Sequence, residues 1–472
     1  MRLFEMLLMF LSIGALWKII WFRNRPTNIV LWGIPSLFVI IGLCHLILEG
    51  WRWQMGLVYL SAIFVLFKYG WYVYHVPTKN VKGRLKPVLL SLFALPFSMV
   101  AVCLPLIFPV FMFESPTGPY KVGAITYTWT DSFQKSSDGK SRRINVQVWY
   151  PANPSVSSRE GKYISNLSEF SKSIEKQYAL PWRLLGYFDL VRTNTYQDAP
   201  FATDVKKAPL IFFSHGNMLG ERFTNSFQTI ELASQGYVVV ALEHPGTALL
   251  SAYPDGTYIS FEDKNPKLSM KYNLQNKASI PTIKQQTKDI EFVTEKIKQL
   301  SQEGADSPFA GKVNLNRLGI IGHSLGGATA VNVLYKNQEF KAAINMDGYL
   351  YGEERQKALD QPLMIMNGGL EYEELDTPPE MKQIEEQRRS KVLGKGYILD
   401  IEQAGHLSFT DIPLYSPIMK VISPDVKRNH RIINEATLCF MDRHLKGEKN
   451  SSCELIPQHY SGTRIQTRGD AE

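Results

Sequence analysis

Four long apolar runs fill about the first quarter of the chain, and no other sequence feature constrains its fold as strongly. They cover residues 3–22, 28–48, 53–74 and 88–113. Each run is close to or above the roughly 20 residues that a helix needs to cross the hydrocarbon core of a bilayer. Tryptophan and tyrosine gather near the ends of the runs, where their amphipathic rings favour the membrane interface. A cleaved signal peptide would account only for the first run. The sequence therefore predicts a transmembrane region of four helices over residues 1–114.

The charges between these runs predict their orientation. Residues 1–114 contain ten Lys or Arg and only three Asp or Glu, whereas the rest of the chain is nearly balanced. The basic residues of the first and third loops are Arg23, Arg25, Lys79, Lys82, Arg84 and Lys86. Because basic loops stay in the cytoplasm, four spans would place the rest of the chain on the other side. We expect a multi-pass cell-membrane protein with an extracytoplasmic C-terminal domain. We expect no nucleic-acid partner, because the excess positive charge belongs to the membrane region.

From residue 120 onward, short apolar runs alternate with segments of helical character, which is typical of a mostly parallel sheet flanked by helices. The predicted strands are 124–130, 144–150, 210–214, 237–243, 317–321, 342–346, 363–367 and 397–402. The predicted helices are 223–235, 283–299, 326–336 and 434–445. Residues 120–472 thus form one predicted α/β domain. Two polar insertions, near 152–206 and 247–281, have the length of lids, binding loops or disordered segments. Within the first insertion, the aromatic segment 180–188 is expected to form a lid, touch lipid or pack as a surface helix.

Residues 317–331 read RLGIIGHSLGGATAV and place Ser324 in a Gly-x-Ser-x-Gly motif. An apolar strand ends at Gly322, and the small residues after Ser324 can open a closely packed helix. In α/β hydrolases this strand-to-helix turn exposes a nucleophilic serine. The context predicts that Ser324 is a nucleophile.

A serine nucleophile needs a base, which follows the serine in the chain order of this fold. His406 is the histidine that follows a predicted strand, on the loop Gln403–Ser408, and it is the predicted base. His430, His444 and His459 lie in or beyond the terminal helix and are expected at the surface.

Two places in the sequence could supply the acid that orients this base. Asp347 ends the strand-like run 342–346, and from the local sequence we favour it. The alternatives form an acidic loop after the next predicted strand, namely Glu371, Glu373, Glu374 and Asp376. The developing oxyanion also needs N–H donors. The residue after the serine, Leu325, supplies one in this motif, and the turn His215-Gly216 points to the Asn217 N–H as the second.

Several segments of residues 120–450 resemble the platelet-activating factor acetylhydrolases of the lipoprotein-associated phospholipase type. They are Phe213-Ser214-His215-Gly216, Glu231–Val239 with Glu243-His244, Gly322–Thr329, the strand end at Asp347, Gln361-Pro362-Leu363, and His406 through Phe409-x-Asp411. The resemblance implies an α/β-hydrolase fold with Ser324, Asp347 and His406 as nucleophile, acid and base, and with Leu325 and Asn217 as oxyanion donors. It also implies calcium-free hydrolysis of esters in phospholipids with short or oxidised acyl chains. The chain departs from the secreted members of the family in two ways. It has four N-terminal apolar runs, and the residue after Asp347 is Gly348, where the family usually has a bulkier neighbourhood.

We therefore predict a membrane-anchored serine hydrolase that cleaves carboxylic esters of phospholipid-like or other amphiphilic substrates, without cofactor or metal. A lipopeptide, amide or lactone hydrolase using the same triad is an alternative, and so is a non-catalytic membrane sensor or binding module. Cys44 and Cys103 lie in apolar runs and are expected to be small core residues. Cys439 and Cys453 could form a disulfide if their domain lies outside the cytoplasm. The sequence leaves the oligomeric state open.

Overall fold

The computed structural model describes residues 2–22, 26–75, 85–262, 271–355, 357–369, 379–448 and 452–469. Its contacts divide the chain into two compact units. The first unit comprises Met1–Phe111, Arg183–Val191 and Tyr415–Ile418. The second comprises Met112–Trp182, Arg192–Leu414 and Met419–Glu472. The first unit thus holds the apolar N-terminal region, and the second holds the alternating strands and helices.

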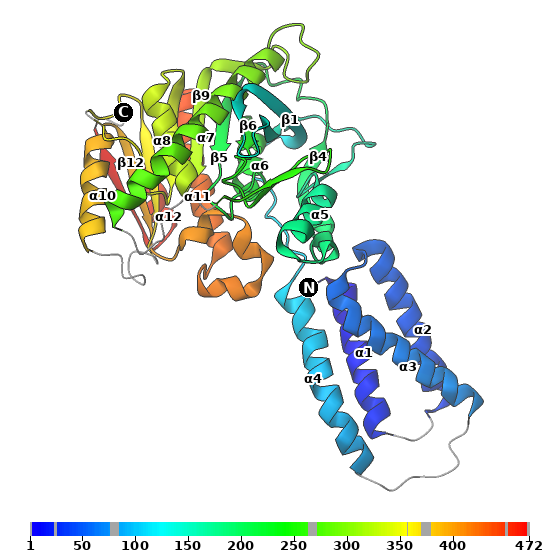
Figure 1. The fold of residues 1–472 in the computed structure, drawn as a ribbon. Helices are drawn as coiled ribbons and strands as arrows, with labels where there is room; N and C mark the ends of the chain where they lie inside the picture. Colours follow the sequence, from blue (N-terminus) through cyan, green and yellow to red (C-terminus); the bar gives the residue numbers. More distant parts are fainter. Residues whose placement is uncertain are drawn as a thin grey trace. The chain divides into compact units, whose positions relative to one another are not determined.

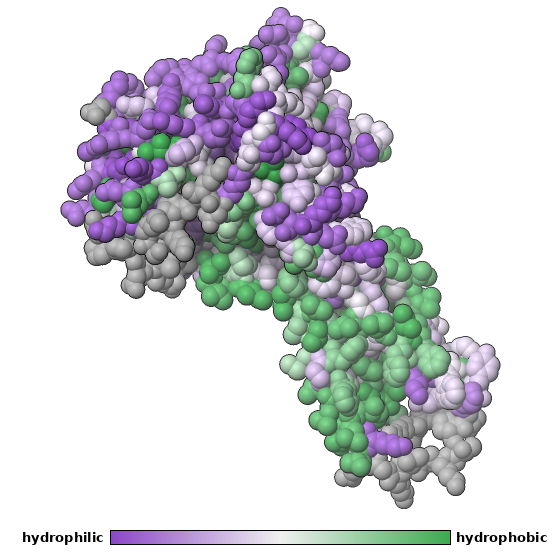
Figure 2. Space-filling model, viewed as in Figure 1, coloured by the Kyte–Doolittle hydropathy of each residue, from purple (hydrophilic) through white to green (hydrophobic). Residues whose placement is uncertain are grey.

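Among the described residues of the first unit, four helices are long and apolar enough to cross a membrane. They are α1 (Leu3–Trp21), α2 (Asn28–Cys44, continued by the π-helical turn His45–Glu49), α3 (Gly56–Tyr74) and α4 (Leu85–Ile107). In the most apolar window of each helix, at most 39% of the residues are buried. Figure 2 shows hydrophobic residues over much of the outside of these helices. Helices that are apolar on all sides suit an apolar surrounding, such as lipid or a protein core.

The fourth helix differs from the predicted run 88–113. It begins earlier, at Leu85, and ends at Ile107, with Pro96 and Pro105 inside it. Pro109 accounts for this end, because a proline disfavours helical backbone in the preceding residue and lacks an N–H donor.

The second unit is built on an 11-stranded sheet with the order β13-β12-β11-β10-β9-β5-β6-β2-β1-β4-β3. Strands β5 (Ala208–Ser214), β6 (Val238–Leu242), β9 (Val313–His323), β10 (Phe340–Met346), β11 (Leu363–Gly368) and β12 (Gly396–Ile401) run parallel at its centre. The outer strands are β1 (Lys121–Lys135), β2 (Ser141–Ala152), β3 (Glu160–Lys162), β4 (Arg192–Gln197) and β13 (Thr463–Arg468). Every residue of β5, β6 and β11 is buried, as expected for strands covered on both faces.

Helices cover both faces of this sheet (Figure 1). On one face α7 (Tyr272–Leu300) and α8 (Leu325–Lys336) pack into the core through apolar residues such as Ile290 and Val331. On the other face α6 (Ser226–Ser234) and α11 (Val426–Met441) do so through Ile230 and Ile433. The remaining α-helices described in this unit are α5 (Leu167–Tyr178), α10 (Pro379–Val392) and α12 (Ile456–His459). The expected α/β-hydrolase fold is confirmed.

The eight predicted strands and four predicted helices all occur. Their ends differ by a few residues, except that α7 begins about a dozen residues and α11 eight residues before the predicted start. The insertion 152–206 contains β3, α5, β4 and the 3₁₀ segment Trp182–Leu190, so part of it extends the sheet. The insertion 247–281 contains the hairpin of β7 (Leu250–Ala252) and β8 (Tyr258–Ser260) and the first turns of α7. Both insertions are therefore largely ordered secondary structure where the structure describes them.

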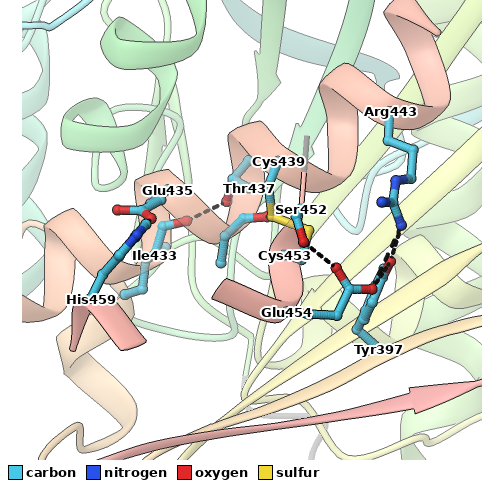
Figure 3. The surroundings of a disulfide bond; sticks show 11 residues. Tyr397, Ile433, Glu435, Thr437, Cys439, Arg443, Ser452, Cys453, Glu454 and His459 are labelled. Carbon is cyan, nitrogen blue, oxygen red and sulfur yellow. Dashed lines mark hydrogen bonds and ion pairs between the residues drawn. A yellow bond between two sulfur atoms is a disulfide. The ribbon is translucent and has the colours of Figure 1, made fainter. Parts of the chain in front are cut away.

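Cys439 on α11 is joined by a disulfide to Cys453, 14 residues later (Figure 3). Around the bridge, Glu454 accepts hydrogen bonds from Ser452 and Tyr397, at 2.8 and 2.9 Å. The other two cysteines differ from expectation, because Cys44 is half-buried and Cys103 is exposed on the outside of α4.

Candidate active site

Ser324 lies at the sharp turn between β9 and α8. Its backbone has φ 56° and ψ −120°, which a non-glycine residue adopts only under strain, and such strain gathers at functional sites. The Ser324 N–H donates to the Met346 carbonyl at 2.9 Å, which ties the turn to the neighbouring strand β10. A Cβ atom at Gly326 would lie 2.2 Å from the Ser214 carbonyl oxygen, so this turn can form only with glycine there. The serine remains half-exposed, while its neighbours in the chain are buried.

Asp347 and His406 meet at the same edge of the sheet. Asp347 follows β10 and has φ 53°, and His406 begins a short 3₁₀ segment after β12. His406 Nδ1 lies 2.7 Å from Asp347 Oδ2, and the other carboxylate oxygen accepts the Gly368 N–H at 2.7 Å. Burial would raise the pKa of Asp347, but the hydrogen bond and charge of His406, together with the Gly368 hydrogen bond and the His323 charge, hold this pKa below its usual value. The carboxylate is therefore ionised and holds the imidazole.

Backbone contacts join this pair to the serine. A Cβ at Gly348 would lie 2.2 Å from the Ser324 carbonyl oxygen, so the acid turn packs directly on the serine turn. The Nε2 atom of His323 lies 3.0 Å from the His406 carbonyl oxygen, and the centroids of the two imidazole rings are 4.5 Å apart. Burial lowers the pKa of His323 to about 3, so its ring is neutral and donates to that carbonyl. The structure thus brings the three predicted residues to one place, at the carboxyl ends of β9, β10 and β12.

The two predicted oxyanion donors also reach this place. Leu325 is the first residue of α8, where N–H groups have no partner within the helix. Asn217 follows the turn His215-Gly216, and a Cβ at Gly216 would lie 3.2 Å from the Ser324 Cβ. Within the described part of the chain, neither N–H donates to a protein acceptor. Both groups are available to bind an anion.

Two buried residues that shape this site were not assigned a role from the sequence. Asn345 donates to the Gly348 carbonyl and accepts its N–H, both at 2.9 Å, which closes the turn after Asp347. Asp411 accepts the Ser226 and Phe227 N–H groups at 2.8 and 3.1 Å and so fastens the His406 loop to the start of α6. For Asn345 the sequence did offer a signal, because it is a polar residue within the otherwise apolar strand Ala343-Ile344-Asn345-Met346.

Two of the histidines expected at the surface were placed wrongly. His444 is half-buried, and its Nε2 atom is buried. His430 is buried, not at the surface: its ring stacks on Phe227 at 3.7 Å and its Nε2 lies 3.0 Å from the Thr410 carbonyl oxygen. Burial lowers the pKa of His430 to about 4. The alternative acids Glu371, Glu373, Glu374 and Asp376 lie outside the described residues.

Two other features of the described residues do not include Ser324. Glu5, His45 and Glu49 have side chains close enough to share a metal ion. The Glu5 carboxylate, however, accepts two hydrogen bonds from the Arg52 guanidinium at 2.6 and 2.9 Å, and this positive charge opposes a cation. A cavity of about 470 Å³ lies between α6, α11 and residues 112–117, and none of the three predicted catalytic residues lines it.

Comparison with known proteins shows which family this chain resembles. The family described as platelet-activating factor acetylhydrolase, isoform II, matches residues 108–455. A platelet-activating factor acetylhydrolase of Cavia porcellus is 27% identical over 282 residues, which are 55% of this chain and 62% of that protein. One of Gallus gallus is 26% identical over 64% of this chain and 78% of the relative. This chain therefore spans less than two thirds of the Cavia porcellus protein.

A solved structure supports the fold alone. The ferulic acid esterase from Streptomyces cinnamoneus superposes with a TM-score of 0.58 at 23% identity. The match covers 76% of this chain and 99% of the esterase.

Proposed function

The chain belongs to the family of platelet-activating factor acetylhydrolase, isoform II, and on that premise we propose that it is a serine hydrolase of carboxylic esters. Ser324 is the nucleophile, His406 the base and Asp347 the acid that orients the base. The observation that supports this assignment best is the 2.7 Å contact of His406 Nδ1 with Asp347, beside the strained serine turn. With Nδ1 on Asp347, the other ring nitrogen of His406 is the one proposed to receive the proton of the serine hydroxyl.

In the proposed reaction, His406 Nε2 takes the proton of Ser324 while the serine oxygen attacks the ester carbonyl carbon. The N–H groups of Leu325 and Asn217 bind the oxyanion that forms. The alcohol leaves with the proton from His406, and Ser324 keeps the acyl group. A water molecule then attacks the acyl group, giving its proton to His406, and the acid product and free serine are released.

The proposed substrates are phospholipid-like or other amphiphilic esters. Two kinds of observation favour them. The relatives are called platelet-activating factor acetylhydrolase and, in Arthroderma benhamiae, probable 1-alkyl-2-acetylglycerophosphocholine esterase. The same chain carries four apolar helices, which would hold an enzyme beside amphiphilic molecules.

We further propose a membrane region over residues 1–114 and a catalytic domain over residues 120–472, outside the cytoplasm. The apolar helices support the membrane region. The disulfide Cys439–Cys453 supports the outer location, because disulfides persist in oxidising compartments. The loop charges support the same orientation, although Arg23, Arg25, Lys79, Lys82 and Arg84 lie outside the described residues.

Hydrolysis of p-nitrophenyl acetate by the full chain in detergent tests the proposed activity. The wild type and Ser390→Ala, which changes an exposed serine on α10, should turn over the ester equally. Ser324→Ala should lose about 10³-fold or more in kcat, as removal of a serine-hydrolase nucleophile does. Turnover by Ser324→Ala at the wild-type rate would refute the mechanism. A panel of phospholipid, lipopeptide and lactone substrates then distinguishes the bonds that this site cleaves.

A further inference from the structure

Two buried histidines lie directly behind the turn that supplies the Asn217 N–H. His215 directly follows β5 and His244 follows β6, and neither has exposed surface. The His244 N–H donates to His215 Nε2 at 2.9 Å, and His215 Nδ1 lies 2.7 Å from the Gly216 carbonyl oxygen. The proposed reaction does not use either ring.

These contacts fix the position of the proton on His215. Its Nε2 accepts the His244 N–H, so Nε2 carries no hydrogen. Burial, with the neighbouring His244, lowers the pKa of His215 to about 3, so the ring is neutral and its one proton is on Nδ1. His215 Nδ1–H therefore donates to the Gly216 carbonyl oxygen.

That hydrogen bond sets the direction of the next N–H group. The Gly216 carbonyl and the Asn217 N–H belong to one planar peptide, and no described peptide bond is cis. In a trans peptide the C=O and N–H bonds point in opposite directions. Since the carbonyl points to the buried His215 ring, the Asn217 N–H points away from that ring. Gly216 lies beside Ser324, since a Cβ added at Gly216 would be 3.2 Å from the Ser324 Cβ.

We propose that His215 is a positioning residue, which holds the Gly216–Asn217 peptide so that the Asn217 N–H faces the oxyanion formed at Ser324. The proposal rests on the proposed function, because it gives that site its second N–H donor. A flipped peptide would instead turn the Gly216 carbonyl oxygen toward the oxyanion and repel it. Holding the donor in place before the reaction is what makes such groups effective.

The surrounding network explains why the His215 ring cannot turn. His244 Nδ1 lies 2.9 Å from Asp289 Oδ2, and its Nε2 lies 3.1 Å from Ser214 Oγ. Arg142 binds both oxygens of Asp289, at 2.7 and 2.8 Å. With its own side chain fixed, the His244 backbone N–H stays in place for His215. The loop after β6 also holds the far side of the turn, where the Met218 N–H donates to the Thr247 carbonyl at 2.8 Å.

Two substitutions at position 215 separate the two hydrogen bonds of this ring. In His215→Asn, the amide nitrogen can replace Nδ1 and still donate to the Gly216 carbonyl, while the acceptor for the His244 N–H is lost. In His215→Gln, the amide oxygen can replace Nε2 and still accept that N–H, while the donor to Gly216 is lost. Each variant loses one buried hydrogen bond, so the loss of thermal stability should be similar. His215→Ala is a second variant without the donor, should His215→Gln not fold.

Steady-state kinetics with p-nitrophenyl acetate and the affinity of a trifluoromethyl ketone provide the test. The ketone forms a tetrahedral oxyanion with the serine and so reports on transition-state binding. We expect His215→Gln and His215→Ala to lose about 10- to 100-fold in kcat and a similar factor in ketone affinity, with KM little changed, since loss of a whole oxyanion donor costs about 10²- to 10³-fold. His215→Asn should stay within about threefold of the wild type.

The control Tyr150→Phe removes a buried hydrogen bond outside this network, the one that the Tyr150 hydroxyl donates to the Ala199 carbonyl at 2.7 Å. It should lower the melting temperature and leave kcat unchanged. Equal kcat losses in His215→Asn and His215→Gln, or a loss in Tyr150→Phe that matches theirs, would overturn the proposal. If the wild type needs Ser324 but His215→Gln and His215→Ala act normally, only the role of His215 fails. If Ser324→Ala is active, the proposed function itself fails.

Discussion

Replacing Asp347 with asparagine tests whether the Asp347–His406 contact orients a catalytic base. The carboxylate accepts two N–H groups, one from Gly368 at 2.7 Å and one from His406 Nδ1 at 2.7 Å. Asparagine has one acceptor oxygen. If that oxygen keeps the Gly368 N–H, the amide nitrogen faces His406 and can only donate. His406 Nδ1 must then accept, and the ring proton moves to Nε2, the atom that should receive the proton of Ser324.

The expected loss follows from this wrong tautomer. The same substitution in a serine protease triad costs about 10⁴-fold in kcat, which corresponds to about 5 kcal/mol of transition-state stabilisation. We expect a loss of that order for Asp347→Asn in p-nitrophenyl acetate hydrolysis at pH 7 to 8. Asp400→Asn is the matched control, because Asp400 lies near the end of β12 and accepts a hydrogen bond from the Asn367 side chain at 2.7 Å. Its kcat should stay within about twofold. A loss below 10-fold in folded Asp347→Asn would refute the reasoning.

Three further outcomes are expected. Gly348→Ala places a Cβ 2.2 Å from the Ser324 carbonyl oxygen and should lower kcat at least about 10-fold. In the control Gly186→Ala the added Cβ meets no atom within 4 Å, so kcat should not change. Equal kcat values in the two variants would contradict this expectation. Cys453→Ser opens a link between residues 14 apart. By loop entropy it should cost about 3 kcal/mol, seen as a lower melting temperature that the reduced wild type shares; an unchanged melting temperature would contradict the expectation. Burial raises the pKa of Asp411 to about 7, far above the value of about 4 in an unfolded chain. Between these values the folded state holds a proton that the unfolded state has released, so the free energy of unfolding falls as pH rises. Urea unfolding should therefore show the wild type losing stability relative to Asp411→Asn between pH 5 and pH 8, and a difference independent of pH would contradict this.

The sequence was sufficient for those parts of the fold that depend on local pattern. The nearly continuous apolar runs around residues 210–214 and 342–346 predicted buried parallel strands, and both occur. Ser324 and His406 were selected by the strand before each and by their order in the chain. Asp347 was favoured over an acidic loop because it ends an apolar strand, and the structure places its carboxylate on His406.

Contacts between distant residues could not be predicted in this way. His215 and Asp289 are 74 positions apart in the sequence. Only the packing of α7 against the sheet brings Asp289 into contact with His244, whose N–H donates to His215. His430 reads as a surface residue on a polar helix, yet its ring is buried on Phe227. Strand β4 lies within a polar insertion, and it forms because β1 offers it a sheet edge.

Labelling intact cells with a membrane-impermeant fluorophosphonate, followed by mapping of the modified peptide, tests the central claim most directly. The reagent reacts with activated serines, so one label reports both the nucleophile and the side of the membrane on which it lies. We predict a label on Ser324 in intact cells, absent from Ser324→Ala. A label on another residue would contradict the assignment of the nucleophile. A label on Ser324 that appears only after lysis would contradict the extracytoplasmic orientation.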